Sequence, residues 1–115
     1  MTSRLGIFGG TFDPIHLGHL RAAENARESL GLDSVLLIAS GTPPHRPPAR
    51  ASAHDRFAMV CLAASEHPAF VAVDDEIRRE GPSYTVDTVG AIADRFPDSS
   101  LHLILGSDAL SGLPS

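Results

Sequence analysis

Residues 5–19 read LGIFGGTFDPIHLGH, and this stretch decides how the chain begins to fold. The apolar run at residues 5–8 predicts a short buried strand, and the glycine pair after it predicts a bend. Beyond the stretch, apolar residues recur at the three- and four-residue intervals of one helix face, at Leu20, Ala23, Ala26 and Leu30. Gly31 then provides a typical helix stop. The sequence therefore predicts a strand, a glycine-rich turn and a helix.

Three more apolar runs, at residues 35–39, 70–73 and 101–105, predict further strands. A helix is expected from the Ser52–Asp55 capping box to Ala64, with Phe57, Val60 and Cys61 on its apolar face, and another over residues 85–95. Alternating strands and helices indicate an α/β fold, a doubly wound, Rossmann-like parallel sheet covered on both faces, formed by residues 1–115 as one domain. Ligands of such sheets bind beyond the carboxyl ends of the strands, which directs attention to the turns after Phe8, Ala39 and Leu105.

Composition excludes several classes of protein. The 115 residues are 43 % hydrophobic and 20 % charged, which is typical of a folded globular domain and not of a disordered chain. The longest apolar run has only eight residues, at 57–64, and no signal-peptide core is visible, so neither a membrane nor secretion is predicted. The single cysteine fits a reducing cytoplasm. A net charge of −5 without any basic run argues against nucleic-acid binding.

The glycine-rich turn is a candidate anion site. Backbone N–H groups near Gly9 and Gly10 can converge on an anion if the glycines adopt positive φ, and the start of the following helix favours negative charge. His16 and His19 are three residues apart and can donate hydrogen bonds to phosphate in a chain that has no lysine. The pattern is neither a dinucleotide fingerprint nor a Walker loop, and no third ligand suggests zinc. The alternative is a plain tight turn whose histidines only cap or pack.

Residues 10–19, GTFDPIHLGH, resemble the His-x-Gly-His hallmark of the nucleotidylyltransferase superfamily. Within it, three further stretches resemble bacterial nicotinate-nucleotide adenylyltransferases: GTPPHR at 41–46, GPSYTVDT at 81–88, and LGSDAL at 105–110 followed by Leu113-Pro114. The first motif identifies only the superfamily, whereas the four in this order are specific to the narrower family. They span nearly the whole chain.

The resemblance implies adenylyl transfer from ATP to nicotinate mononucleotide, with Mg²⁺ assisting, to give nicotinate adenine dinucleotide and pyrophosphate in NAD biosynthesis. It makes His16 and His19 the catalytic pair that holds the ATP phosphates. The remaining positions implied to bind substrate or nucleotide are backbone groups of Gly9, Gly10, Thr11 and Phe12, the loop residues His45 and Arg46, Thr85 on the nicotinate side, and Gly106 and Asp108 in the nucleotide pocket.

Members of this family continue well past the length of this chain, so the domain is interpreted as lacking its C-terminal part. A sheet left open in this way favours self-association or another partner. Two alternatives remain open. One is a different transferase of the superfamily, such as pantetheine-phosphate adenylyltransferase or a cytidylyltransferase. The other is a catalytically inactive nucleotide-binding fragment.

Several residues are expected to be structural. Cys61 is interpreted as a small core residue of its helix and not as a nucleophile. The acidic run at residues 74–76 is interpreted as a solvated strand end. His54, His67 and His102 match no motif and are assigned no role at the site.

Overall fold

The computed structural model describes residues 3–12, 14–41, 51–78 and 85–104. The strands in these ranges are β1 (Arg4–Gly10), β2 (Ser34–Ala39), β3 (Phe70–Val73) and β4 (Ser100–Ile104). The helices are α1 (Leu17–Leu30), α2 (Ala53–Ala64), α3 (Asp75–Arg78) and α4 (Thr85–Arg95). The alternation expected from the apolar runs is confirmed, and α3 is an addition to it.

The strands form one parallel sheet in the order β3-β2-β1-β4. The register places Ile7 of β1 opposite Leu36 of β2 and Leu103 of β4. The chain steps outward from β1 through β2 to β3, and then returns past β1 to form β4 on the other side. This reversal makes the sheet doubly wound, as predicted, and puts its topological switch point between β1 and β4.

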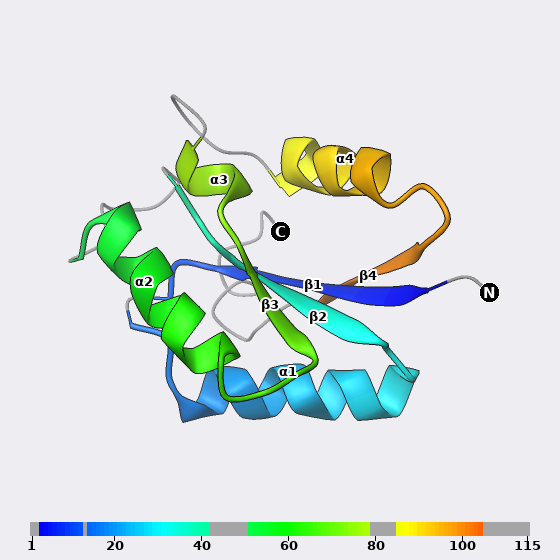
Figure 1. Ribbon diagram of the computed structural model, residues 1–115, viewed down its shortest axis with the longest axis horizontal. Helices are drawn as coiled ribbons and strands as arrows, with labels where there is room; N and C mark the ends of the chain where they lie inside the picture. The colour runs from blue at the N-terminus through cyan, green and yellow to red at the C-terminus, as the bar shows by residue number, and fades with distance from the viewer. Residues whose placement is uncertain (1–2, 13, 42–50, 79–84, 105–115) are drawn as a thin grey trace, which may run out of the picture.

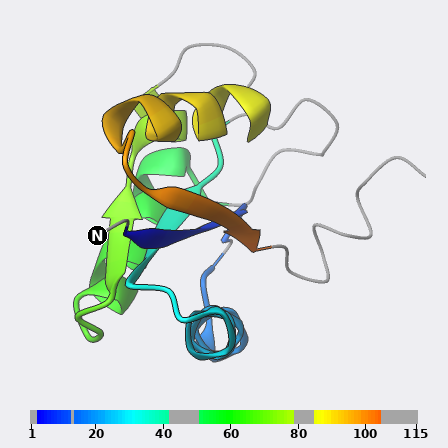
Figure 2. The same cartoon turned by 90° about the vertical axis from the view of Figure 1, so that its right-hand side faces the viewer.

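Helices cover both faces of the sheet, which is why its strands are almost continuously apolar. Ala23 of α1 and Val60 of α2 pack with Leu37 on one face, whereas Ile92 of α4 packs with Leu36 on the other. The two neighbouring leucines of β2 point to opposite faces because side chains alternate along a strand. Figures 1 and 2 show the same division, with α4 on one side of the sheet and α1 on the other.

Local signals set the ends of the first two long helices. Gly31 ends α1 in the left-handed conformation, with a φ of 63°, and the Ser52 hydroxyl accepts a 3.1 Å hydrogen bond from the Asp55 N–H at the start of α2. Gly31 confirms the predicted helix stop, and Ser52 confirms the predicted start of α2; of the expected capping box, the Ser52 hydrogen bond is present. α1 begins at Leu17, before Leu20, the first apolar position of the predicted helix, because His16 acts as its N-cap.

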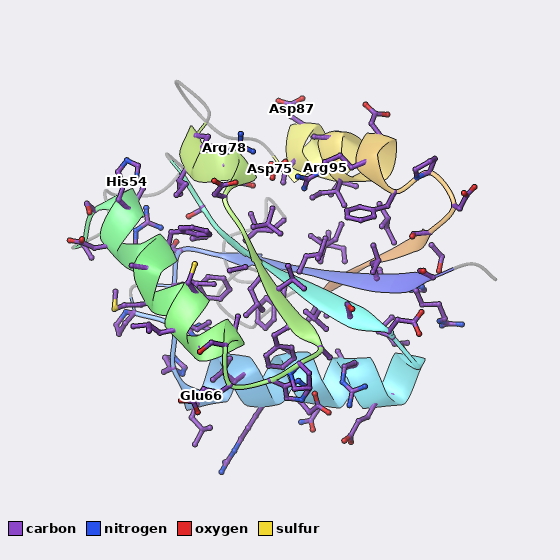
Figure 3. The ribbon with its side chains drawn as sticks, viewed as in Figure 1. His54, Glu66, Asp75, Arg78, Asp87 and Arg95 are labelled. Carbon is purple, nitrogen blue, oxygen red and sulfur yellow. The ribbon has the colours of Figure 1, made fainter. Side chains whose placement is uncertain are left out.

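The acidic run starts directly after β3 but continues into a helix, so the prediction of a solvated strand end is wrong for Asp75 and Glu76. Asp75 and Glu76 begin the short helix α3, and both contact α4. Asp75 Oδ1 lies 3.1 Å from Nη2 of Arg95, and the Thr88 hydroxyl donates a 2.8 Å hydrogen bond to Glu76. Figure 3 shows Asp75 and Arg95 close together between the two helices. These polar contacts help to fix α4 on its face of the sheet.

The expectation that Cys61 is a core residue is also wrong, because Cys61 is exposed. The buried side chains of α2 are those of Arg56, Val60 and Ala64, which are spaced by four residues and therefore lie along one face. Cys61 is one residue beyond Val60 and is turned away from that face. Arg56 instead occupies a buried position for which an apolar side chain would be expected.

The three histidines without a motif lie on α2, on β4 and between α2 and β3. His54 is exposed on α2, and His102 lies 3.3 Å from the Ser100 hydroxyl. His67 stacks on a phenylalanine of β3, and its Nε2 lies 2.9 Å from Glu24 of α1. A side-chain hydrogen bond from Arg27 lowers the pKa of the Glu24 carboxyl, and the nearby charges of Arg27 and His67 act in the same direction.

The described sheet has β3 and β4 at its edges, and each edge strand exposes an apolar side chain. Val71 of β3 and Leu103 of β4 are both close to half exposed. Self-association through such an edge stays a prediction, as does the single incomplete domain over residues 1–115. Within the described ranges, no helix has the length and apolar character needed to cross a bilayer.

Replacing Ile92 by alanine tests the packing of α4 on the sheet. Ile92 is fully buried, so Ile92→Ala should lower the free energy of unfolding in urea by about 2–5 kcal/mol, because it removes buried methyl groups and leaves a cavity. Leu62→Ala, at an exposed position of α2, is the control and should change the free energy of unfolding by less than about 0.5 kcal/mol. Equal losses in the two variants would contradict a core beneath α4.

Candidate functional site

The turn after β1 and the start of α1 form the candidate site, at the carboxyl end of the sheet. β1 ends at Gly10, which pairs with Ala39 of β2. The Gly10 carbonyl also accepts a 2.8 Å hydrogen bond from the Ser40 N–H. The segments that follow β1 and β2 therefore stay side by side just past the ends of both strands. Since β1 borders the switch point, the turn lies where open α/β sheets bind their ligands.

His16 and His19 cap the N-terminus of α1 reciprocally. The Gly18 N–H donates a 3.1 Å hydrogen bond to Nδ1 of His16, and the His16 N–H donates a 3.0 Å hydrogen bond to Nδ1 of His19. The first N–H groups of a helix have no partner within the helix, and these two imidazoles satisfy part of that need. The histidines are therefore fixed to the backbone of the helix that they begin.

The cap also selects the tautomer of both rings. A ring nitrogen that accepts a hydrogen bond from a backbone N–H cannot itself carry a proton. In the neutral imidazole the proton must then be on Nε2, which makes Nε2 a hydrogen-bond donor. The cap thus turns two side chains that can donate or accept at either nitrogen into two defined Nε2 donors.

The two rings are stacked, with centroids 3.8 Å apart and planes inclined by 30°. Both histidine side chains therefore point to the same side of the chain. Phe12 meets the His19 ring edge-on at 5.1 Å and the Phe8 ring at 5.6 Å. The His16 side chain is exposed, whereas Phe12 is only 3 % exposed, so the pair is accessible at one end and anchored in the core at the other.

The expected left-handed bend is present, but not at the glycine pair. Gly9 and Gly10 belong to β1, and in this turn it is Phe12 that has a positive φ, of 50°. This conformation costs a non-glycine residue about 1–3 kcal/mol, and the burial of the Phe12 ring offsets the cost. The prediction that Gly9 and Gly10 provide the positive φ is therefore wrong.

Gly18 has a steric role in the histidine pair. A Cβ atom added at Gly18 would lie 2.9 Å from Cε1 and 3.1 Å from Nδ1 of His16, closer than real Cβ contacts. Any larger residue would push the His16 ring from the position in which its Nδ1 accepts the Gly18 N–H. The glycine between the histidines is thus explained by close approach of a side chain, and not by an unusual φ.

Two features add positive potential near the start of α1. The first turn of α1 contains no acidic residue, so the partial positive charge of the helix N-terminus is not offset within that turn. Arg56 of α2 lies close by, since its Nη1 donates hydrogen bonds to the carbonyls of Thr11, at 2.7 Å, and Ser40, at 2.8 Å. Both features favour an anionic ligand.

Sequence reasoning missed Arg56. The signal was present, because Arg56 precedes Val60 by four residues and so shares the apolar face of its helix. A cation on a buried face requires partners, and nothing in the local sequence says that these are backbone carbonyls of two strand ends. Ser40 was missed too: its hydroxyl oxygen is buried and has no hydrogen-bond partner among the described residues.

The structure brings together only part of the predicted site. Gly9, Gly10, Thr11 and Phe12 lead from β1 toward the histidine pair, as expected. Thr85 is the first residue of α4. The other predicted positions, His45, Arg46, Gly106 and Asp108, lie outside the described residues.

No group of three or more histidine, cysteine, aspartate or glutamate side chains converges as a metal site within the described part of the chain. His16 and His19 also use Nδ1 for the helix cap, which removes one ligating nitrogen from each ring. The described residues therefore provide no group of three or more side chains that could hold a divalent cation by themselves.

A separate apolar hollow of about 230 Å³ lies between α1 and α2. Its walls include Leu20, Ala63 and Phe70, and its polar rim includes Glu24 and His67. These two rim residues pair with each other, and the walls are almost entirely apolar, which does not suit a polyanion. The chemistry of the histidine pair, and not the size of this hollow, identifies the candidate site.

Residues 7–115 match the family model described as cytidylyltransferase-like. The chain belongs to this family. Proteins named "Probable nicotinate-nucleotide adenylyltransferase" from Aeromonas hydrophila and Acidithiobacillus ferrooxidans are each 50 % identical to it, over 111 and 105 residues. These matches cover 96 % and 91 % of this chain but 52 % and 48 % of the relatives, so the chain spans about half their length. The predicted resemblance to nicotinate-nucleotide adenylyltransferases is confirmed.

Solved structures of low sequence identity share the fold. The Plasmodium falciparum nicotinic acid mononucleotide adenylyltransferase complexed with NaAD has a TM-score of 0.76 at 17 % identity, and the match covers 95 % of this chain and 54 % of that one. The same enzyme complexed with APC gives a TM-score of 0.73 at 18 % identity, covering 95 % of this chain and 53 % of that one. The chain therefore shares the fold of about half of this enzyme.

Gly18→Ala tests the close approach at the helix start. The added methyl group should displace the His16 ring, break its hydrogen bond from the Gly18 N–H, and shift the Nδ1 resonance of His16 in ¹⁵N imidazole spectra, while the helix content is retained. Gly90→Ala is the matched control, because a Cβ at that exposed position of α4 meets nothing within 4 Å.

Gly90→Ala should raise the free energy of unfolding by about 0.5–1 kcal/mol, as expected of a glycine inside a helix, and leave the imidazole spectra unchanged. An unshifted His16 resonance in Gly18→Ala would contradict the steric role of Gly18.

Proposed function

We propose that the protein transfers the adenylyl group of ATP to nicotinate mononucleotide, yielding nicotinate adenine dinucleotide and pyrophosphate, as a step of NAD biosynthesis. Membership of the cytidylyltransferase-like family and the names of relatives 50 % identical to the chain support a nucleotidyl transfer of this kind. The single observation that carries the proposal is the stacked pair His16 and His19, whose reciprocal cap defines two Nε2 donors at a helix N-terminus.

The histidine pair suits a polyphosphate better than other ligands. Phosphate oxygens accept hydrogen bonds, and the two Nε2–H groups supply donors without the flexibility of a lysine. The uncompensated N-terminus of α1 adds favourable potential. In this proposal His16 and His19 bind the ATP phosphates and donate to the oxygens on which negative charge increases in the transition state.

The transfer is a single displacement. An oxygen of the 5′-phosphate of nicotinate mononucleotide forms a bond to the α-phosphorus of ATP, and the bond from that phosphorus to the oxygen bridging to the β-phosphate breaks. The electron pair leaves with pyrophosphate. The attacking phosphate is already an anion, so the step requires alignment and charge stabilisation and no covalent enzyme intermediate.

The other predicted positions are proposed to complete the binding of the two nucleotides. Backbone groups of Gly9, Gly10, Thr11 and Phe12 would contact the nucleotides beside the histidine pair. His45 and Arg46 would bind the phosphates, Thr85 the nicotinate carboxylate, and Gly106 and Asp108 the nucleotide.

Mg²⁺ remains part of the proposal, bound through the substrate. The described residues offer no convergent group of three or more ligands, so the ion would be held mainly by the substrate phosphates. Mg²⁺ commonly keeps several waters and binds substrate phosphates with few protein ligands, and it would supply further charge neutralisation on the triphosphate. The cytoplasmic location and self-association predicted from the sequence stay predictions.

Product analysis tests the proposed reaction in the full-length natural protein. The protein is incubated with ATP–Mg²⁺ and, separately, nicotinate mononucleotide, nicotinamide mononucleotide or phosphopantetheine. Nicotinate adenine dinucleotide should be the main product, with equimolar pyrophosphate. A preference for phosphopantetheine would overturn the choice of acceptor, and ATP binding without any turnover would favour the nucleotide-binding alternative.

His19→Ala tests the histidine pair. Removing one of two preorganised donors should lower kcat by roughly 10²–10³-fold, with the circular dichroism spectrum unchanged. His54→Ala is the control, because His54 is an exposed histidine near the start of α2, where Figure 3 labels it. Wild-type turnover in His19→Ala would remove this histidine from the mechanism.

A further inference from the structure

Arg56 connects the segments that surround the candidate site. Besides the carbonyls of Thr11 and Ser40, its guanidinium donates to the carbonyl of Ala51 through Nε, at 3.2 Å, and to that of Gly41 through Nη2, at 3.4 Å. Thr11 lies 45 positions away in sequence, and Ser40 lies 16 away. One side chain thus joins the turn after β1, the end of β2 and the residue before the N-cap of α2.

We propose that Arg56 is a positioning residue for the turn formed by residues 10–12, which leads to His16 and His19. The proposal rests on the function proposed above and adds a residue to it. Arg56 would act through the backbone. Its Nη1 donates to both the Thr11 and the Ser40 carbonyls and so fixes the direction in which the chain leaves β1. The next residue, Phe12, has the left-handed φ and contacts the His19 ring.

The burial of Arg56 argues against a role in packing alone. The side chain is 3 % exposed, and no carboxylate among the described residues pairs with it. Burying a charge without a counter-ion is costly, and apolar residues usually fill a buried helix position at least as well. Val60 and Ala64 fill that face of α2 in this way. The guanidinium is distinguished by its rigid fork of donors, which fixes the relative positions of several acceptors.

The positive charge of Arg56 also suits an anion-binding site at the turn after β1. Backbone carbonyls offset the charge of Arg56 only in part, because they are dipoles and not anions. The nearby start of α1 also lacks an acidic residue. An anionic ligand at the turn would therefore meet a positive potential that exists before it binds, and such a preorganised potential does not have to form during the reaction.

Two substitutions of Arg56 distinguish the effect of its planar fork of donors from the effect of its positive charge. Arg56→Lys keeps the positive charge and loses the planar fork, and Arg56→Met keeps a long side chain and loses both. Val60→Ala is the matched control, because Val60 is fully buried one helical turn further along the same face and touches none of the four carbonyls. Val60→Ala should destabilise α2 and leave the hydrogen bonds of Arg56 in place.

Three measurements on the full-length natural protein test the proposal: calorimetric binding of inorganic tripolyphosphate, steady-state kinetics of adenylyl transfer, and ¹⁵N spectra of the imidazoles. Both Arg56 variants should raise the Kd for tripolyphosphate about tenfold, shift the His16 and His19 resonances, and lower kcat on the order of 10²-fold, the cost of a misplacement of about 1 Å. Val60→Ala should lower the melting temperature and leave all three quantities near wild type.

The proposal is wrong if both Arg56 variants bind tripolyphosphate and turn over like wild type. It is also wrong if Arg56→Lys retains wild-type tripolyphosphate binding and turnover, since charge alone would then suffice. It is wrong as well if Val60→Ala causes the same losses as the Arg56 variants, since general destabilisation would then explain them. If the Arg56 variants do not fold, the wild-type protein still tests the proposal. Tripolyphosphate should shift the ¹⁵N resonance of Arg56 Nε together with the resonances of His16 and His19. An unmoved Nε resonance would contradict a link between Arg56 and the histidine pair.

These outcomes are distinguishable from a failure of the proposed function. If wild type binds tripolyphosphate but forms no dinucleotide, the proposed reaction fails, and the binding and imidazole measurements still decide the role of Arg56. If wild type forms dinucleotide and the Arg56 variants match it, only the positioning role fails.

Discussion

The reciprocal cap between His16 and His19 is the interaction on which the candidate site depends. A helix that begins at the carboxyl end of a parallel sheet must find partners for its first N–H groups, and here two imidazoles provide them. The same hydrogen bonds fix the ring orientation and the tautomer, so a requirement of folding determines the chemistry that the rings can perform. Because the cap needs both Nδ1 atoms, the Nε2 atoms become the donors, and Gly18 provides the space in which the cap can form.

The sequence predicts the sheet and the histidine pair well because both depend on local patterns. Apolar runs at strand spacing, helical periodicity and the stop at Gly31 each act over a few residues, and the structure confirms them. The errors at Cys61 and Asp75 have another origin. Cys61 is apolar but lies one position off the buried face of its helix, and Asp75 is polar but pairs with Arg95 of a different helix. Composition alone does not reveal such tertiary partners.

The turn shows the same limit. A pair of glycines is the usual local sign of a left-handed bend, yet it is Phe12 that has the positive φ, because its ring is buried against Phe8 and His19. The strain is local, whereas the contacts that offset it come from the preceding strand and the following helix. Arg56 is the extreme case, since its partners Thr11 and Ser40 are distant in sequence and are recognised through backbone atoms that carry no sequence signal.

These long-range contacts explain how a short motif becomes a site. The His-x-Gly-His pattern determines which atoms can donate, but the position of those donors depends on where the chain leaves β1. That exit is held by Ser40, which pairs with Gly10, and by Arg56, which binds the next carbonyl. The motif supplies the donors, and the ends of β1 and β2 with the buried cation place them. A change at Arg56 can therefore affect the histidine pair without any contact between them.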